Sequence, residues 1–160
     1  MRIDLLDTLP PELDAVADAS PLATFYHTRA WLLSLAESYP RLSLRCLVAG
    51  DGGATLAYLP YFETRRGFLR TMWSLPFGTY GGPVGVGEAC LELLREYRSH
   101  LSRPGVIEIG CVDFHGTCPV PGWETIETSA HVIDISGGFD AVWRDRFDKP
   151  RRRRVRRAHE

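Results

Sequence analysis

Alternating apolar and polar positions predict a series of strands in the first half of the chain. A period of two over residues 42–49 is typical of a strand, and a second apolar run covers residues 54–63. The glycine-rich turn at 50–53 joins the two runs, which predicts a hairpin, and a third strand is predicted over 69–75. Because Pro60 lacks the amide hydrogen that a strand ladder uses, its position predicts a sheet edge or a bulge.

Apolar residues at helical spacing predict four helices. The first follows Pro10, and the second begins at Thr28, whose side chain can cap it, and is stopped by Pro40. The clearest helix begins near Glu88, where apolar positions recur on one face until Pro104 ends the pattern. The last helix is predicted after a pair of glycines, and its apolar face consists of Phe139, Val142, Trp143 and Phe147.

Three more strands are predicted in the second half of the chain, over residues 106–112, 123–127 and 131–135. The resulting order is helices, a three-strand meander, a helix, further strands and a helix. This order predicts an α/β (α+β) fold with a mixed, largely antiparallel sheet flanked by helices. We divide the chain into a domain at 1–138 and a helical, arginine-rich segment at 139–160.

The composition of the sequence and its lack of an export signal predict a globular protein of the cytoplasm. Of the 160 residues, 44% are apolar or aromatic, which is enough to build a core and excludes a disordered chain. No apolar run approaches the roughly 18 residues of a membrane-spanning helix. Several acids near the N-terminus also exclude a secretory signal: Asp4, Asp7, Glu12, Asp14 and Asp18. Without an export signal, the four cysteines, Cys46, Cys90, Cys111 and Cys118, are expected to be free thiols.

The net charge of −1 is unevenly distributed along the chain. Residues 149–160 hold seven bases and one acid, a balance of +6, so residues 1–148 carry −7. A basic end of this kind can contact nucleic acid or another polyanion, but the helical spacing of its residues favours a helix that continues the last one. Both interpretations remain open from the residues alone.

Two further patterns have chemical alternatives. The glycine-rich residues 81–87 run from a strand into a helix, where backbone amides could approach a phosphate, but no Lys-Ser or Lys-Thr follows and a tight turn is favoured. The residue types of Cys111, Asp113, His115 and Cys118 suit zinc, yet their spacing does not supply a four-ligand site, so we predict no metal. Motifs of serine hydrolases, zinc proteases and redox dithiols are absent from the sequence.

Several segments together resemble the FemAB-like branch of the GNAT acyltransferase superfamily. They are residues 25–32 (FYHTRAWL), 59–60 (LP), 74–83 (SLPFGTYGGP), 134–136 (DIS) and 147–160 (FDKPRRRRVRRAHE). The last segment is similar to the arginine-rich signature of that family, which lies where the first of two GNAT-like halves passes into the second. The resemblance covers nearly the whole chain.

The resemblance implies transfer of an acyl or aminoacyl group to an amine. The donor would be acyl-CoA, such as acetyl-CoA, or aminoacyl-tRNA, bound mainly by the second GNAT-like half. The acceptor would be an amine-bearing precursor of peptidoglycan or surface polysaccharide, with or without phosphate. Because the chain ends within the arginine-rich signature, we expect it to be the first half and inactive alone. Nucleic acid is expected as a partner only if the donor is aminoacyl-tRNA.

The same resemblance assigns site residues. It places Tyr80, Gly81 and Gly82 in the cleft shared by the halves, and Arg153, Arg156 and Arg157 on phosphates of a substrate. Such chemistry aligns two substrates, deprotonates the amine and stabilises an oxyanion with backbone amides at a splayed sheet. For Tyr26 and Trp31, packing of an amphipathic helix is favoured over a place in the cleft wall. The catalytic base is unassigned among Glu108, Asp113, His131 and Asp134.

Two other functions remain open from the sequence. One is a noncatalytic module that binds a phosphorylated glycan precursor or a partner chain. The other is a nucleic-acid-binding domain that uses the basic end. Binding of polynucleotides that is sensitive to salt would separate the second from the first.

Overall fold

The structure is a computed structural model that describes every residue except 113–120, 125, 128, 130–133 and 159–160. The chain divides into two compact units, Met1–Trp123 and Glu124–Glu160. This boundary lies earlier in the chain than residue 138, where the sequence pattern suggests a division. None of the helices among the described residues is long and apolar enough to span a membrane.

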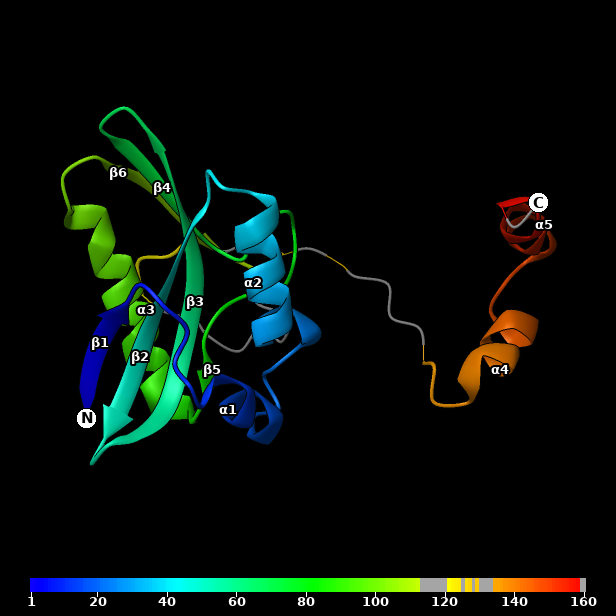
Figure 1. The fold of residues 1–160 in the computed structure, drawn as a ribbon, viewed down its shortest axis with the longest axis horizontal. Helices are drawn as coiled ribbons and strands as arrows, with labels where there is room; N and C mark the ends of the chain where they lie inside the picture. The colour runs from blue at the N-terminus through cyan, green and yellow to red at the C-terminus, as the bar shows by residue number, and fades with distance from the viewer. Residues whose placement is uncertain (113–120, 125, 128, 130–133, 159–160) are drawn as a thin grey trace. The chain divides into compact units, whose positions relative to one another are not determined.

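The first unit is built on one six-stranded sheet (Figure 1). Its strands are β1 (Arg2–Leu6), β2 (Ser43–Asp51), β3 (Ala54–Arg66), β4 (Leu69–Ser74), β5 (Val84–Gly85) and β6 (Val106–Cys111). The main order is β1-β2-β3-β4-β6, and β5 pairs with β3. All pairs are antiparallel except β4 with β6. The predicted fold class, a mixed and largely antiparallel sheet with helices, is confirmed.

Helices cover both faces of the sheet. They are α1 (Leu13–Ala19), the 3₁₀ turn η1 (Phe25–His27), α2 (Arg29–Ser38), α3 (Gly87–Ser99) and the 3₁₀ turn η2 (His100–Ser102). The predicted cap is present, because the Thr28 hydroxyl accepts a hydrogen bond from the Trp31 amide at 3.4 Å. Helix α3 links β4 to β6, a connection that a parallel pair requires.

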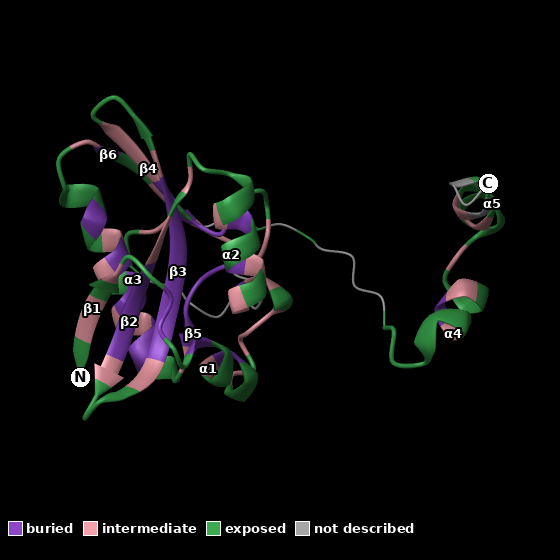
Figure 2. Cartoon of the chain, viewed as in Figure 1, coloured by how far each residue is buried: buried purple, intermediate pink, exposed green. Residues whose placement is uncertain are grey.

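The central strand β3 is apolar on both faces because each face is covered by helices. Ala57, Leu59 and Tyr61 belong to the core under α3, whereas Tyr58 and Phe62 pack with α1 and α2. Figure 2 shows β3 as the most continuously buried strand of the sheet. Successive side chains of β3 therefore point to opposite faces of the sheet and belong to two separate cores.

The prediction of an edge or a bulge at Pro60 is wrong, because β3 is central. On one side Pro60 pairs with Cys46 of β2. On the other side β5 pairs with β3 at Ala57 and Tyr58, and β4 pairs only from Phe62 onward. Pro60 lies in the gap between these two partners, so its missing amide hydrogen costs no ladder bond. We call this place the β3 gap.

The second unit contains two short helices, α4 (Gly138–Asp145) and α5 (Lys149–Ala158). The prediction of one helix that includes Phe147 is wrong, because α4 ends at Asp145 and the Asp148 carboxylate accepts a hydrogen bond from the Arg151 amide at 2.8 Å. That bond starts a new helix. The Trp143 ring still lies 5.5 Å from the Phe147 ring.

The predicted strands over 123–127 and 131–135 are wrong where they can be described. Trp123, Glu124, 126–127 and 134–135 are not in strands. Residues 125 and 131–133 lie outside the described part of the chain.

Candidate functional site

The loop that follows β4 crosses the β3 gap in an unusual backbone conformation. Leu75 and Phe77 have φ values of +63° and +66°, in the left-handed region that non-glycine residues seldom occupy. Such residues cost of order 1–3 kcal/mol each and persist where surrounding structure holds them. Leu75 is held in this way, since it is fully buried in the core on the side of α1 and α2.

Ser74 closes the β3 gap in place of a strand partner. Its hydroxyl is buried, donates to the Pro60 carbonyl at 2.8 Å and accepts from the Gly82 amide at 2.8 Å. On the other side of the loop, the Gly81 amide donates to the Val112 carbonyl at 2.7 Å. The loop is thereby fixed both to β3 and to the end of β6.

Gly81 and Gly82, which the resemblance places in a cleft, are buried. Their amides donate to Val112 and Ser74, so in this structure both are directed at protein acceptors. A Cβ atom on Gly81 would lie 2.0 Å from the Ser74 carbonyl oxygen. Gly81 therefore allows two backbone segments to approach closely, and Gly82 adopts a φ of +98°, a backbone conformation that favours glycine.

Tyr80, the third residue of that set, belongs to an aromatic cluster composed of Phe25, Tyr26, Trp31 and Tyr80. Its ring is half-buried and lies 5.8 Å from that of Tyr26, which lies 5.3 Å from Trp31. Trp31 lies 5.6 Å from Phe25, whose side chain is 64% exposed. Tyr26 and Trp31 also pack against the core on this face, so they serve both as packing and as the wall of an exposed aromatic surface. Sequence reasoning missed Phe25, although it begins the first matching segment.

The three arginines that the resemblance assigns to substrate phosphates, Arg153, Arg156 and Arg157, all belong to helix α5. Arg153 and Arg157 line an open depression of about 420 Å³, together with Lys149, Pro150 and Arg154. The cations at 149, 153 and 157 share a helix face because they are four residues apart. Arg156 belongs to α5, and its side chain falls outside the described set.

Two of the four possible bases can be described. Glu108 is exposed on β6. Asp134 accepts a hydrogen bond from the Ser136 amide at 2.9 Å, and this bonding lowers its pKa, which weakens it as a base. Asp113 and His131 lie outside the described residues.

The cysteines and the possible zinc site are described only in part. Cys46 is a free thiol in the core, and burial raises its pKa to about 12, so it is inert. Of the zinc candidates, Asp113, His115 and Cys118 fall on undescribed positions, and no group of metal-binding side chains occurs among the residues that are described.

His100 gives the fold a predicted pH dependence. It is fully buried beside Tyr61, and burial, then the charge of Arg103, lowers its pKa below the usual value of about 6.5, with Arg70 acting in the same direction and Glu96 opposing. The unfolded chain therefore takes up this proton more readily than the folded chain. The free energy of unfolding should fall as the pH drops through about 6.5, and level off below the folded pKa.

The measurement is urea denaturation between about pH 7.5 and about pH 5 for wild type and His100→Gln. We expect the wild-type curve to lose stability more steeply over this range. Parallel curves for the two proteins would contradict the assignment to His100.

Three comparisons with known proteins identified no relative of this chain. No protein-family model, curated protein or solved structure matches the chain. The function is therefore inferred from the motifs and from the geometry around the β3 gap.

Proposed function

We propose that this chain is the N-terminal half of a FemAB-like GNAT N-acyltransferase. The intact enzyme would transfer an acyl or aminoacyl group to an amine acceptor in peptidoglycan or surface-polysaccharide metabolism. One observation carries the proposal. The two segments that best support the resemblance, 25–32 and 74–83, are far apart in sequence and meet where Tyr26 contacts Tyr80 at 5.8 Å.

The sheet topology gives further support. A meander is followed by the helix α3 and by a strand that pairs in parallel with β4, and β3 changes partners across a gap. The resemblance implies a sheet of this kind, splayed near the reacting groups. A shared fold alone does not establish an activity, so the proposal depends mainly on the contact between segments 25–32 and 74–83.

In this proposal the chain supplies the acceptor side. The exposed aromatic cluster would contact the apolar or sugar surface of the acceptor, and Arg153 and Arg157 would bind phosphate through paired guanidinium donors. Acyl-CoA or aminoacyl-tRNA would be held mainly by the second half, in the cytoplasm where both donors occur. Since the reaction needs alignment rather than a side-chain nucleophile, the absence of a catalytic triad motif agrees with it.

We expect Tyr80→Ala to lower kcat/KM roughly tenfold in a protein that joins this chain to a second GNAT-like half, because one stacking contact contributes about 0.5–1.5 kcal/mol beyond its buried area. The assay follows transfer from acetyl-CoA, and in parallel from charged tRNA, to an amine-bearing peptidoglycan precursor. Phe68→Ala is the matched control, because Phe68 is 82% exposed in the β3–β4 turn.

Three results would count against the proposal. Full turnover by this chain alone would show that the active site does not depend on a second half. An unchanged rate for Tyr80→Ala would show that the aromatic cluster is not part of the active site. Binding of the precursor with no turnover in either protein would favour a noncatalytic binding module.

A second candidate function is nucleic-acid binding by α5. The observation that favours it is the exposure of Arg151, Arg153, Arg154 and Arg157 on this helix. If it holds, binding of mixed RNA should weaken steeply with salt, and Arg153→Gln with Arg157→Gln should reduce the slope by about two. Arg2→Gln, an exposed change in the first unit, should leave the slope unchanged.

A further inference from the structure

The face of the sheet beneath α3 changes from apolar to charged at one end. Leu59 and Tyr61 lie in the core that α3 covers. The next β3 positions on that face are Glu63 and Arg65, and the neighbouring strands contribute Arg45 and Arg70 there. Because α3 ends at Ser99, this end of the face is lined instead by residues of η2 and the turn after it.

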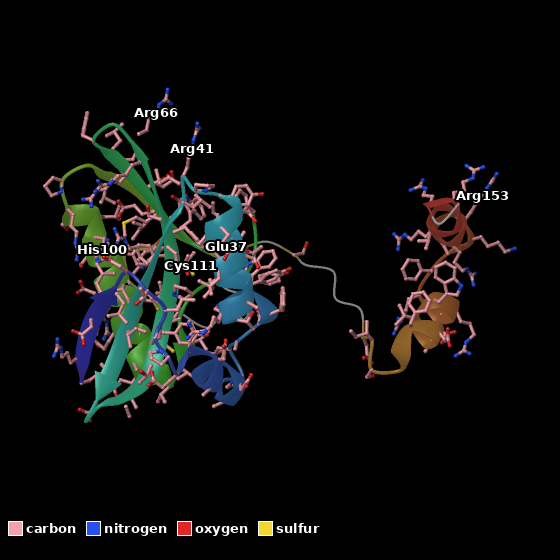
Figure 3. All side chains as sticks on the ribbon, viewed as in Figure 1. Glu37, Arg41, Arg66, His100, Cys111 and Arg153 are labelled. Carbon is pink, nitrogen blue, oxygen red and sulfur yellow. The ribbon has the colours of Figure 1, made fainter. Side chains whose placement is uncertain are left out.

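These residues surround a hollow of about 250 Å³, which we call the basic hollow. Its polar lining consists chiefly of Arg45, Arg65, Arg70, Arg103, Tyr61 and His100. Figure 3 labels His100 on the α3 side of the sheet and Glu37 on α2, which covers the other face. Tyr26 and Trp31 of the aromatic cluster pack in the core on the α2 side, so the basic hollow lies on the opposite face of the sheet from that cluster.

The basic hollow holds more positive than negative charge. Its lining has four arginines and two acids, Asp7 and Glu63, a balance of +2. Glu96 lies beside it, 3.4 Å from Arg103, and reduces the balance to +1. Asp7 pairs with Arg45, but its side chain is 78% exposed, so this pair is weak and easily exchanged.

Each arginine of the basic hollow has a partner, but the contacts among the described residues do not use all of their guanidinium donors. Arg65 donates one bond to Glu63 at 2.9 Å. Arg70 donates to the Pro104 carbonyl at 2.8 Å and lies 4.0 Å from Glu63. Each guanidinium carries five N–H donors, so these contacts leave several free to bind an anion.

Two side chains without a formal charge, His100 and Tyr61, also line the hollow. His100 is fully buried, and neither of its ring nitrogens has a hydrogen-bond partner among the described residues; the nearest acid oxygen, of Glu96, is 3.6 Å away. Tyr61 is 1% exposed, and burial raises its pKa to about 12, so its hydroxyl stays protonated and can donate.

We propose that the basic hollow binds a phosphate group, either as inorganic phosphate or as the terminal group of a small phosphomonoester. Paired guanidinium donors match the geometry of phosphate oxygens, and the excess positive charge matches an anion with more than one negative charge. The hollow is smaller than the roughly 300–1,000 Å³ of sites for drug-sized ligands, so it would take the phosphate rather than a whole nucleotide.

Isothermal titration of the full chain tests this proposal. One arm uses inorganic phosphate and a second uses glucose 6-phosphate, at constant ionic strength made up with chloride. We expect one saturable site, and Arg45→Gln with Arg103→Gln should weaken it roughly tenfold or more because each removes charge-assisted hydrogen bonds. Arg66→Gln is the matched control, since Arg66 lies exposed at the tip of the β3–β4 hairpin and outside the hollow (Figure 3).

The two arms distinguish the sources of the phosphate. Saturable binding of both probes supports an open site for a phosphomonoester, and binding of inorganic phosphate alone supports a site for the free ion. No saturable binding, or equal affinity in wild type and the double variant, would overturn the proposal. A failed acyltransferase assay would leave this result untouched, because the titration depends on Arg45 and Arg103, which have no part in the proposed acyltransferase site.

A measurement on the wild-type protein guards against misfolding of the variant. The ring nitrogen signals of His100, assigned by their loss in His100→Gln, should shift on addition of phosphate with the affinity found by titration. Unchanged His100 signals at saturating phosphate would place any bound anion elsewhere.

Discussion

We expect Gly81→Ala to destabilise the protein by about 3 kcal/mol or more, because the added methyl group has nowhere to go. A Cβ atom there would lie 2.0 Å from the carbonyl oxygen of Ser74 and 2.5 Å from its carbonyl carbon. Both atoms belong to the backbone of Ser74, the last residue of β4, so the clash cannot be relieved by rotation of a side chain. The loop must move, and the bond from the Gly81 amide to Val112 must lengthen.

Thermal unfolding measures this effect. For a chain of this size each kcal/mol shifts Tm by roughly 2–4 °C, so Gly81→Ala should lower Tm by about 6 °C or more. The matched control is Gly87→Ala at the start of α3, where an added Cβ meets nothing within 4 Å. That change should leave Tm unchanged or raise it slightly, because alanine favours a helix over glycine. Equal Tm values for the two variants would show that the loop does not approach Ser74 this closely.

The second large effect is expected for Ser74→Ala, which should lower the free energy of unfolding by about 2–4 kcal/mol. The serine hydroxyl makes two buried hydrogen bonds of 2.8 Å, to the Pro60 carbonyl and from the Gly82 amide. Alanine leaves both backbone groups buried without these partners. Such groups cost about 1–3 kcal/mol each, more than the hydroxyl costs to bury.

Urea denaturation of wild type and Ser74→Ala gives this difference directly. Ser99→Ala is the control, because its hydroxyl donates to the Glu96 carbonyl at 2.7 Å on the exposed side of α3. We expect its effect to remain within about 0.5 kcal/mol. A Ser74→Ala protein as stable as the control would mean that water or another group forms hydrogen bonds with the Pro60 carbonyl and the Gly82 amide in place of the serine hydroxyl.

Both predictions bear on the proposed function through Tyr80. This residue directly precedes Gly81, and its ring contacts Tyr26. A displaced loop should therefore disturb the aromatic cluster as well as the sheet. The near-ultraviolet circular dichroism of Gly81→Ala should lose aromatic signal even at temperatures where the variant remains folded.

Much of the first unit could be predicted from local patterns. The strands β2, β3, β4 and β6 and the helices α2 and α3 follow the alternation, the capping residue and the helical spacing in the sequence. These signals act over a few residues, so they are readable without knowledge of the fold. Local signals fail where contacts between distant segments determine the structure. Pro60 is tolerated in a central strand only because β4 and β5 leave a gap beside it.

The sequence by itself determined the fold class, the segments that resemble one family and the concentration of arginines at the end of the chain. Only the tertiary structure decided that residues 25–32 meet 74–83, that Ser74 joins Pro60 to Gly82, and that Arg45, Arg70 and Arg103 share one hollow. The physical reason is that strand register and helix placement set these contacts. Each depends on residues distant in the chain, whereas periodicity records only which face of its own element a residue occupies.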